Sequence, residues 1–177
     1  MAIRTIRMYP DPVLREAAAP VTVVDDAVRA LARDMAETMY DAPGIGLAAP
    51  QVGVQRRVLV YRTSEEDELH TLINPEIVSS SGEVTEDEGC LSIPGLSYPV
   101  TRAQRVSVRA LDLEGKPLAY DAEDLEARVI QHEIDHLDGV LFIDRIDEEL
   151  RREARRVLRE RIDGPPPQAL RAPAARI

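Results

Sequence analysis

Hydrophobic residues recur at helical spacing in three segments of the chain, and this pattern predicts three α-helices. The first helix spans about residues 25–40 and the third about residues 147–162. In the second, residues 122–138, apolar positions occupy two adjacent stripes, so we expect this helix to be buried against a sheet. A shorter segment, residues 11–15, places Asp before Pro and predicts a single capped helical turn.

Between the first two helices the pattern changes to short β-branched runs separated by turn residues such as Asn74-Pro75 and Ser81-Gly82. Helices at the ends and strands in the middle predict an α+β domain, with short, mostly antiparallel strands packed around the helix 122–138. We expect one domain over residues 1–162 and a disordered tail, rich in Pro, Ala and Arg, over 163–177. The predicted strands are 58–61, 69–73, 76–79, 106–111 and 117–120.

Composition narrows the classes of partner. The chain is 44% hydrophobic, which suits one domain with a real core, and its net charge of −10 with 3% aromatic residues argues against general DNA or RNA binding. No apolar run is long enough for a signal peptide or a membrane helix, so we expect a cytoplasmic protein without a membrane partner. The single cysteine, Cys90, excludes an internal disulfide.

The segment with the clearest chemistry is H-E-x-x-H, formed by His132, Glu133 and His136 inside the second predicted helix. Residues four apart share one helix face, so both imidazoles can bind one metal ion. The glutamate between them can take a proton from water that the metal activates. Only three histidines occur in the chain, and two of them lie in this motif.

The identity of a third metal ligand separates the protein classes that use this motif. The position at which metzincin proteases carry a third histidine is Phe142, which cannot bind a metal. A downstream carboxylate from Asp144, Asp147 or Glu148 is one open alternative, and it would indicate a metalloprotease or general amidase. The upstream alternative is the thiolate of Cys90, a donor suited to zinc or ferrous iron. A non-enzymatic module with a closed metal site is a further alternative.

Three segments in order along the chain resemble the bacterial-type peptide deformylase family. Residues 44–51 match G-x-G-x-A-A-x-Q, residues 88–92 match E-G-C-L-S, and residues 131–136 match Q-H-E-x-x-H. The resemblance covers about residues 3–162, which makes this part the catalytic domain. It implies removal of the formyl group from the N-terminal formylmethionine of nascent polypeptides by metal-activated water, with release of formate.

The resemblance also implies a set of metal ligands and a general base. Cys90, His132 and His136 would hold one divalent ion, and Glu133 would be the general base that later protonates the leaving amine. The family typically works with Fe²⁺, and Zn²⁺, Ni²⁺ or Co²⁺ can substitute. The side chain of Gln51 and the backbone N–H of Leu91 would donate to the oxyanion.

Further positions follow from the same resemblance. Ile45, Gly46 and Gly89 are expected to contact the substrate peptide, and Val129 is expected to form a wall of the methionine pocket. Arg128 occupies a position that is often apolar in the family, and we expect its stem to pack at the pocket rim while its charge faces out.

The surroundings of the metal ligands are predicted as well. The resemblance implies that Glu88 pairs with Arg102 and braces the Cys90 segment, although most of the acidic run 83–88 is expected to be solvated. Asp135 is expected to lie on the helix surface or to act as a cap.

The last predicted helix is rich in arginine within an otherwise acidic chain. Its glutamates favour a solvated face balanced by i,i+4 pairs. The functional alternative is docking on ribosomal RNA, since the resemblance implies that some members use this helix so. The arginines of this region are Arg145, Arg151, Arg152, Arg155, Arg156, Arg159 and Arg161.

Overall fold

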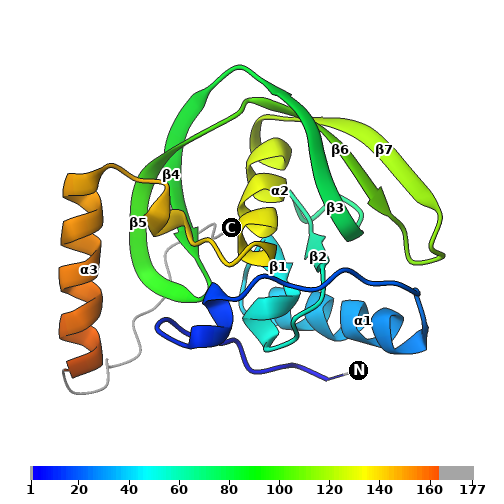
Figure 1. Ribbon diagram of the computed structural model, residues 1–177, viewed down its shortest axis with the longest axis horizontal. Coiled ribbons are helices and arrows are strands. Elements are labelled where there is room, and N and C mark those ends of the chain that lie inside the picture. The colour runs from blue at the N-terminus through cyan, green and yellow to red at the C-terminus, as the bar shows by residue number, and fades with distance from the viewer. Residues whose placement is uncertain (1, 164–177) are drawn as a thin grey trace.

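The computed structural model describes residues 2–163, so the predicted tail lies outside the described residues except for Asp163. Within these residues the chain forms seven strands and three α-helices (Figure 1). The helices are α1 (Asp26–Asp41), α2 (Asp124–Leu137) and α3 (Glu148–Asp163), and three short 3-10 helices are η1 (Pro12–Arg15), η2 (Ala49–Val52) and η3 (Phe142–Asp144). The strands are β1 (Gly46–Ala48), β2 (Val58–Tyr61), β3 (His70–Ser81), β4 (Val84–Cys90), β5 (Ile93–Arg102), β6 (Arg105–Leu111) and β7 (Pro117–Glu123).

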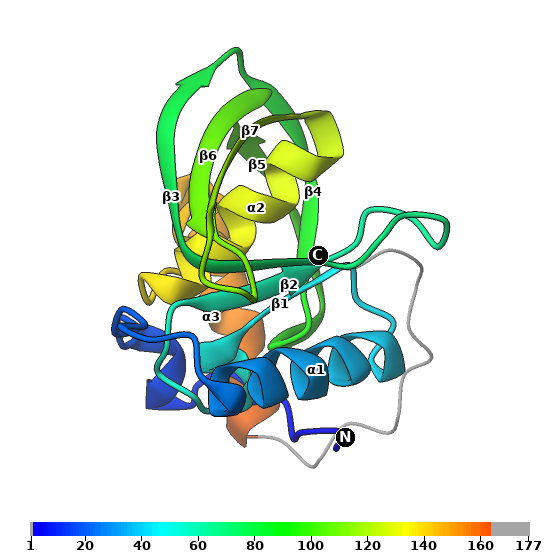
Figure 2. The ribbon, with the colours of Figure 1, turned by 90° about the vertical axis from the view of Figure 1, so that its right-hand side faces the viewer.

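The strands form two antiparallel sheets on either side of α2. One sheet has five strands in the order β1-β2-β3-β6-β7, and the other contains β4 and β5. Figures 1 and 2 show α2 enclosed between these sheets, with α1 below β1 and β2 and α3 beside β5. The prediction of an α+β domain with mostly antiparallel strands around a central helix is therefore confirmed.

The three helices begin and end within two residues of the predicted bounds. The side chain of Asp25 accepts a hydrogen bond from the backbone N–H of Val28 at 2.9 Å and caps α1. In α2, ten of the fourteen residues are buried, because both sheets cover the helix. Apolar stripes on two adjacent faces are what such a doubly covered helix requires.

The strands differ more from the prediction than the helices do. The predicted strands 69–73 and 76–79 are one strand, β3, which runs through Asn74-Pro75 with an irregular register. Asn74 adopts a φ of 51°, a left-handed conformation that asparagine tolerates, and its side chain pairs with both backbone polar groups of Val21 at 2.8 Å. The sequence signal for a break therefore marks a bend within a continuous strand.

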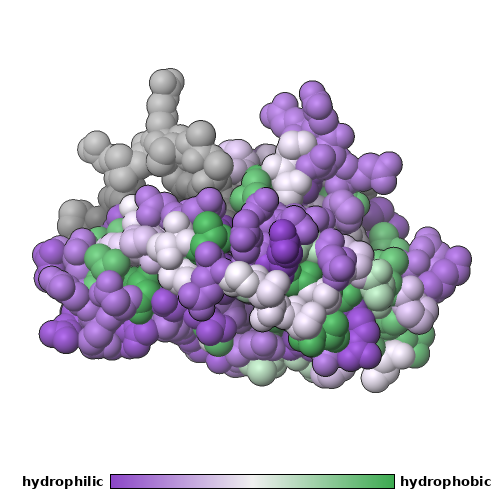
Figure 3. All heavy atoms as spheres, turned by 90° about the horizontal axis from the view of Figure 1, so that it is seen from above, coloured by the Kyte–Doolittle hydropathy of each residue, from purple (hydrophilic) through white to green (hydrophobic). Residues whose placement is uncertain are grey.

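One face of the described part is covered mainly by polar residues. On the face shown in Figure 3, hydrophilic residues surround scattered hydrophobic ones. None of the helices in residues 2–163 has the length and apolar character needed to cross a bilayer.

Candidate metal centre

Three potential metal ligands meet between β4 and α2. Cys90 ends β4, and His132 and His136 lie one turn apart on α2. The Cys90 sulfur and one nitrogen from each histidine lie within 4.8 Å of one another, and Cys90 Sγ is 3.2 Å from His136 Nε2. All three side chains are buried. The structure thus brings together the three residues predicted from sequence.

The surroundings of these residues fit a divalent cation. His132 Nδ1 lies 3.0 Å from Glu88 Oε2, while the buried His132 Nε2 has no hydrogen-bond partner in the described part of the chain. A buried polar atom without a partner is costly, and a cation at this position would satisfy it. Burial raises the pKa of the Cys90 thiol to about 12, so a thiolate here requires a positive charge beside it. One thiolate and two imidazoles form a donor set suited to zinc, ferrous iron, cobalt or nickel.

The downstream carboxylates take no part in this cluster. Asp144 accepts a hydrogen bond from the backbone N–H of Leu141 at 2.9 Å, and Asp147 caps the start of α3 through the N–H of Leu150 at 2.9 Å. Glu148 is exposed and pairs with Arg152 at 3.4 Å. Among the described residues, Cys90 is therefore the third ligand that the geometry offers, and none of the three downstream carboxylates joins the cluster.

Glu133 lies beside the three ligands with both carboxylate oxygens buried and without a hydrogen-bond partner among residues 2–163. Burial, and secondarily the charge of Glu88, raise its pKa well above the ordinary value for glutamate. Gly46 on β1 makes room for this carboxylate, because a Cβ at Gly46 would lie 2.4 Å from Glu133 Oε1. The glycine is thus required by the Glu133 side chain itself.

One hydrogen-bond donor from η2, the side-chain amide of Gln51, faces the cluster. Gln51 Oε1 accepts from the backbone N–H of Ala48 at 2.8 Å, which fixes the orientation of the amide. Gln51 Nε2 then faces Ser92 Oγ at 3.3 Å and Cys90 Sγ at 3.7 Å. Leu91 follows Cys90 directly and is buried.

Glu88 is the centre of a buried ionic network. Arg102 donates to both of its oxygens at 2.8 and 2.9 Å, in the pairing that the sequence suggests. Burial alone would raise the pKa of Glu88, but hydrogen bonds from Arg102 and His132 outweigh it and hold the pKa well below the usual range. Because Glu88 is ionised and can only accept, His132 Nδ1 carries the proton that they share.

Arg128 differs from the sequence-based expectation. Its side chain is 1% exposed rather than placed at a rim with its charge in solvent. The guanidinium donates to Glu88 Oε1 at 2.6 Å and to the carbonyl oxygens of Val100 and Val84 at 3.0 and 2.9 Å. These acceptors on β4 and β5 replace water, so the charge does not need to reach the surface.

Asp135 is also buried, not on the helix surface as expected. It accepts from Arg102 Nη1 at 2.6 Å, and Arg145 donates to its two oxygens at 3.0 and 2.5 Å. The sequence carries no sign of this pairing, because its three members are separated along the chain and each is a common surface residue.

The residues expected to contact substrate lie on the strands and helix that border the metal ligands. Gly89 is on β4 just before Cys90, and Ile45 directly precedes β1. Val129 is fully buried in the same hydrophobic cluster on which Ile45 packs. A direct contact between Val129 and methionine stays a prediction.

The buried Cys-His-His set fits a divalent cation and has the carboxylate of Glu133 beside it. Metal-dependent hydrolases use such an arrangement, in which three protein ligands leave one position of the metal open and a nearby carboxylate handles the protons. The sequence profile of the polypeptide deformylase family matches residues 3–152. The chain therefore belongs to the peptide deformylase family, whose members are metal-dependent hydrolases that remove the N-formyl group from nascent peptides.

Individual relatives support the same assignment. A peptide deformylase from Alkalilimnicola ehrlichii is 58% identical over 160 residues, which are 89% of this chain and 90% of that protein. The crystal structure of a peptide deformylase from Legionella pneumophila has a TM-score of 0.84 at 46% identity and covers 93% of this chain and 100% of that chain. A Met-Ala-Ser-bound class I type b peptide deformylase from Acinetobacter baumannii has a TM-score of 0.78 at 34% identity, over 82% of this chain and 99% of that one.

Proposed function

We propose that this chain deformylates N-terminal formylmethionine with Cys90, His132 and His136 as ligands of one divalent ion and Glu133 as the proton carrier. The observation that carries the proposal is the carboxylate of Glu133, buried without a partner beside three converging ligands. We further propose Fe²⁺ as the cellular ion, with Zn²⁺, Ni²⁺ or Co²⁺ as substitutes. A bound ion of this kind would polarise the formyl carbonyl and lower the pKa of water.

Glu133 transfers the proton that the reaction moves from water to the leaving nitrogen. Hydrolysis adds one water to the formamide, breaks the C–N bond, and yields formate and the free amine of methionine. Glu133 accepts a proton from the attacking water and delivers it to the departing nitrogen. The absence of competing hydrogen bonds to its oxygens supports this role.

Gln51 and Leu91 stabilise the negative charge that develops on the formyl oxygen. Gln51 Oε1 is engaged by the Ala48 backbone N–H, so Nε2 is directed toward the cluster and available to donate. The backbone N–H of Leu91 follows the ligand Cys90 directly and is the second donor.

The substrate peptide extends along the edge of the larger sheet. β1 is its terminal strand in the described residues, and we propose that the peptide pairs with the backbone around Ile45 and Gly46, with Gly89 on the facing strand. The Met-Ala-Ser tripeptide bound by the Acinetobacter relative has the sequence of a deformylated product. Ile45 and Val129 are the proposed apolar wall near the methionine side chain.

A panel of matched peptides tests the reaction. The Ni²⁺-loaded protein is incubated with formyl-Met-Ala-Ser, acetyl-Met-Ala-Ser and formyl-Ala-Met-Ser, and products are identified by mass spectrometry. We expect formate and intact Met-Ala-Ser from the first peptide, with far slower release from the other two. Cleavage of an internal peptide bond, or equal rates on all three, would contradict the proposal.

We also propose that the enzyme works in the cytoplasm and that α3 contacts ribosomal RNA. The structure divides the arginines of this region into two groups. Arg145 binds Asp135, Arg151 donates to the carbonyl oxygens of Asp144 and Ile146, and Arg161 donates to the Pro94 carbonyl at 2.6 Å. These three serve the fold.

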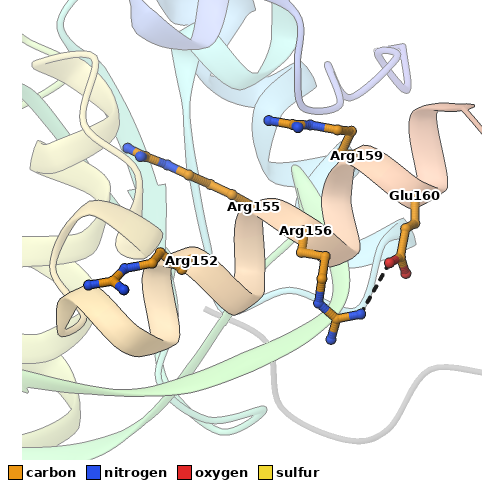
Figure 4. Close-up of a pocket in the computed structure, with 5 residues that line it drawn as sticks. All are labelled: Arg152, Arg155, Arg156, Arg159 and Glu160. Atoms are coloured by element: carbon orange, nitrogen blue, oxygen red, sulfur yellow. Dashed lines mark hydrogen bonds and ion pairs between the residues drawn. The ribbon is translucent and has the colours of Figure 1, made fainter.

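The remaining arginines form an exposed cationic surface on α3. Arg152, Arg155, Arg156 and Arg159, together with Glu160, line a shallow pocket, and their side chains project from the helix in Figure 4. Arg152 and Arg156 have glutamate partners at 3.4 and 3.1 Å, whereas Arg155 and Arg159 have no ion-pair partner within residues 2–163. Unpaired cations in an acidic protein support contact with phosphate groups.

Charge reversal tests this contact. We expect Arg155→Glu/Arg159→Glu to lose co-sedimentation with ribosomes while formate release from a tripeptide stays unchanged. The matched control is Arg105→Glu/Arg109→Glu, which makes the same charge change at exposed sites on β6. Equal sedimentation of both variants and the wild type would remove the ribosome contact.

A further inference from the structure

A chain of charged side chains leads from the metal centre to the segment that precedes α3. The hydrogen-bonded chain that joins His132, Glu88 and Arg102 continues beyond Arg102. Arg102 Nη1 donates to Asp135 Oδ2 at 2.6 Å, and Arg145 donates to both Asp135 oxygens at 3.0 and 2.5 Å. Four of these five residues are buried, and Arg145 reaches the surface.

Arg102 lies between two carboxylates and donates to each of them through different nitrogens of its guanidinium group. Its Nε and Nη2 bind Glu88, while Nη1 binds Asp135. A guanidinium is planar and its donors have fixed directions, so these bonds together determine its orientation. A rotation that turns Arg102 away from Glu88 would also break its bond to Asp135.

We propose that Asp135 is a positioning residue of the metal centre, which holds Arg102 so that Glu88 keeps the His132 ring oriented, and that Arg145 in turn holds Asp135. The inference rests on the proposed role of His132 as a metal ligand. Partners that orient a ligating imidazole contribute to metal affinity, typically by a factor of about 10 to 100.

Metal affinity gives the first test. Dissociation constants for Ni²⁺ alone are measured by competition with a chelator for the wild type and for Asp135→Asn. We expect the variant to bind Ni²⁺ about tenfold more weakly. The matched control is Asp138→Asn, three residues further along the chain, whose half-exposed carboxylate pairs with Arg57 at 2.6 Å. This control should retain the wild-type affinity.

A double-variant cycle separates positioning from a simple effect of the Asp135 charge on the cation. If Asp135 acts through Arg102, Asp135→Asn should add no further loss of Ni²⁺ affinity in an Arg102→Gln background. An undiminished loss in that background would overturn the positioning role and leave a direct charge effect.

Nitrogen NMR of the metal-free protein gives an independent reading. The Nδ1–H resonance of His132 reports its hydrogen bond to Glu88, and we expect it to shift or broaden in Asp135→Asn but not in Asp138→Asn. If Asp135→Asn does not fold, Arg145→Gln takes its place, with a smaller loss of affinity and a change in the same resonance.

The outcomes distinguish this inference from the proposed function. A wild type that binds Ni²⁺ tightly, together with Asp135→Asn and Arg145→Gln variants that match Asp138→Asn, would overturn only the positioning role. A wild type that does not bind Ni²⁺ through Cys90, His132 and His136 would overturn both.

Discussion

At the scale of single residues, Glu133 depends on the space that a glycine leaves. The carboxylate is buried without a hydrogen-bond partner, and Gly46 borders it closely enough that any side chain would collide with it. A carboxylate that must accept and return a proton needs this freedom from competing partners.

Gly46→Ala tests this dependence. The added Cβ would lie 2.4 Å from Glu133 Oε1, so the carboxylate must move. Because general acid–base catalysis contributes a factor of 10² to 10⁴, we expect kcat for formate release to fall by about a hundredfold with metal content unchanged.

The control for this prediction is Gly44→Ala. A Cβ at Gly44 meets the end of the Leu91 side chain at 2.7 Å, and a flexible methyl group can shift. We expect this variant to keep most of its activity. Equal losses in the two variants would contradict a specific displacement of Glu133.

The role of a residue can be predicted from sequence where the residue belongs to a motif. It cannot be predicted where the role depends only on partners that the fold brings together. Cys90, His132 and His136 belong to motifs whose residue types fit one metal site, and the structure brings them together. The sequence predicts Arg128 and Asp135 at the surface, because their actual partners lie 10 to 44 residues away along the chain and follow no spacing rule.

At the scale of elements, β4 and α2 are joined by ionic rather than apolar contacts. Arg128 on α2 donates to Glu88 and to two backbone carbonyls of the smaller sheet. Removing Arg128 would leave Glu88 with its other partners, Arg102 and His132. It would take one charged donor from this buried carboxylate and leave the carbonyl oxygens of Val84 and Val100 without that donor. The contact therefore stabilises the position of β4, which carries Cys90.

We expect Arg128→Met to lower the free energy of unfolding by about 3 kcal/mol, since breaking a buried ion pair typically costs about 3–5 kcal/mol. Urea denaturation measures the change. Arg105→Met, which removes an exposed pair with Glu123, should cost less than about 1 kcal/mol. Similar losses of unfolding free energy in both variants would contradict a larger stabilising effect of the buried Arg128 contacts.

The N-terminal segment is fastened to α1 through Asp34. Its oxygens accept from the backbone N–H of Ala2 at 3.0 Å and from Arg4 at 2.9 Å. Burial raises the pKa of Asp34, but these hydrogen bonds lower it more, so the pKa lies below the ordinary value. A depressed carboxyl pKa contributes stability above the unfolded pKa of about 3.9, and this is lost as pH falls through the folded value.

Asp34→Asn should therefore be less stable than the wild type at neutral pH, and the difference should shrink below about pH 4. Urea denaturation of both proteins from pH 7 to acid measures it. A difference that stays constant down to the lowest pH would contradict the ionic contribution of Asp34.

The elements were predictable where apolar residues recur at a regular spacing. The three helices carry clear apolar stripes, and their bounds were found within two residues. The predicted strands include none at β1, β4 or β5. In β4, positions 85–87 are polar and exposed, and the inward residue Glu88 is charged. An ionic interface does not produce the alternation that identifies a strand.

At the scale of the whole molecule, the ligands of the proposed metal centre come from two different elements, the smaller sheet and the helix α2. Cys90 belongs to the smaller sheet, whereas His132 and His136 belong to the helix that packs on the larger one. A ligand that binds only the folded state stabilises it by mass action. A bound ion would therefore contribute to the stability of the entire fold as well as to the proposed catalysis.

Removing the metal should lower the midpoint of thermal unfolding, and added Ni²⁺ should restore it. At free ion about a thousand times the dissociation constant, the expected stabilisation is about 4 kcal/mol. Scanning calorimetry of chelated and Ni²⁺-loaded protein measures the shift. In Cys90→Ser the shift should be much smaller, and an equal shift would place the ion elsewhere.

The measurement that tests the central claim most directly is formate release from formyl-Met-Ala-Ser by anaerobically purified, Fe²⁺-loaded protein, with Glu133→Ala beside the wild type. The account predicts rapid release by the wild type and its loss in the variant, with metal still bound in both. No release from a fully metallated wild type, or undiminished release from Glu133→Ala, would contradict it.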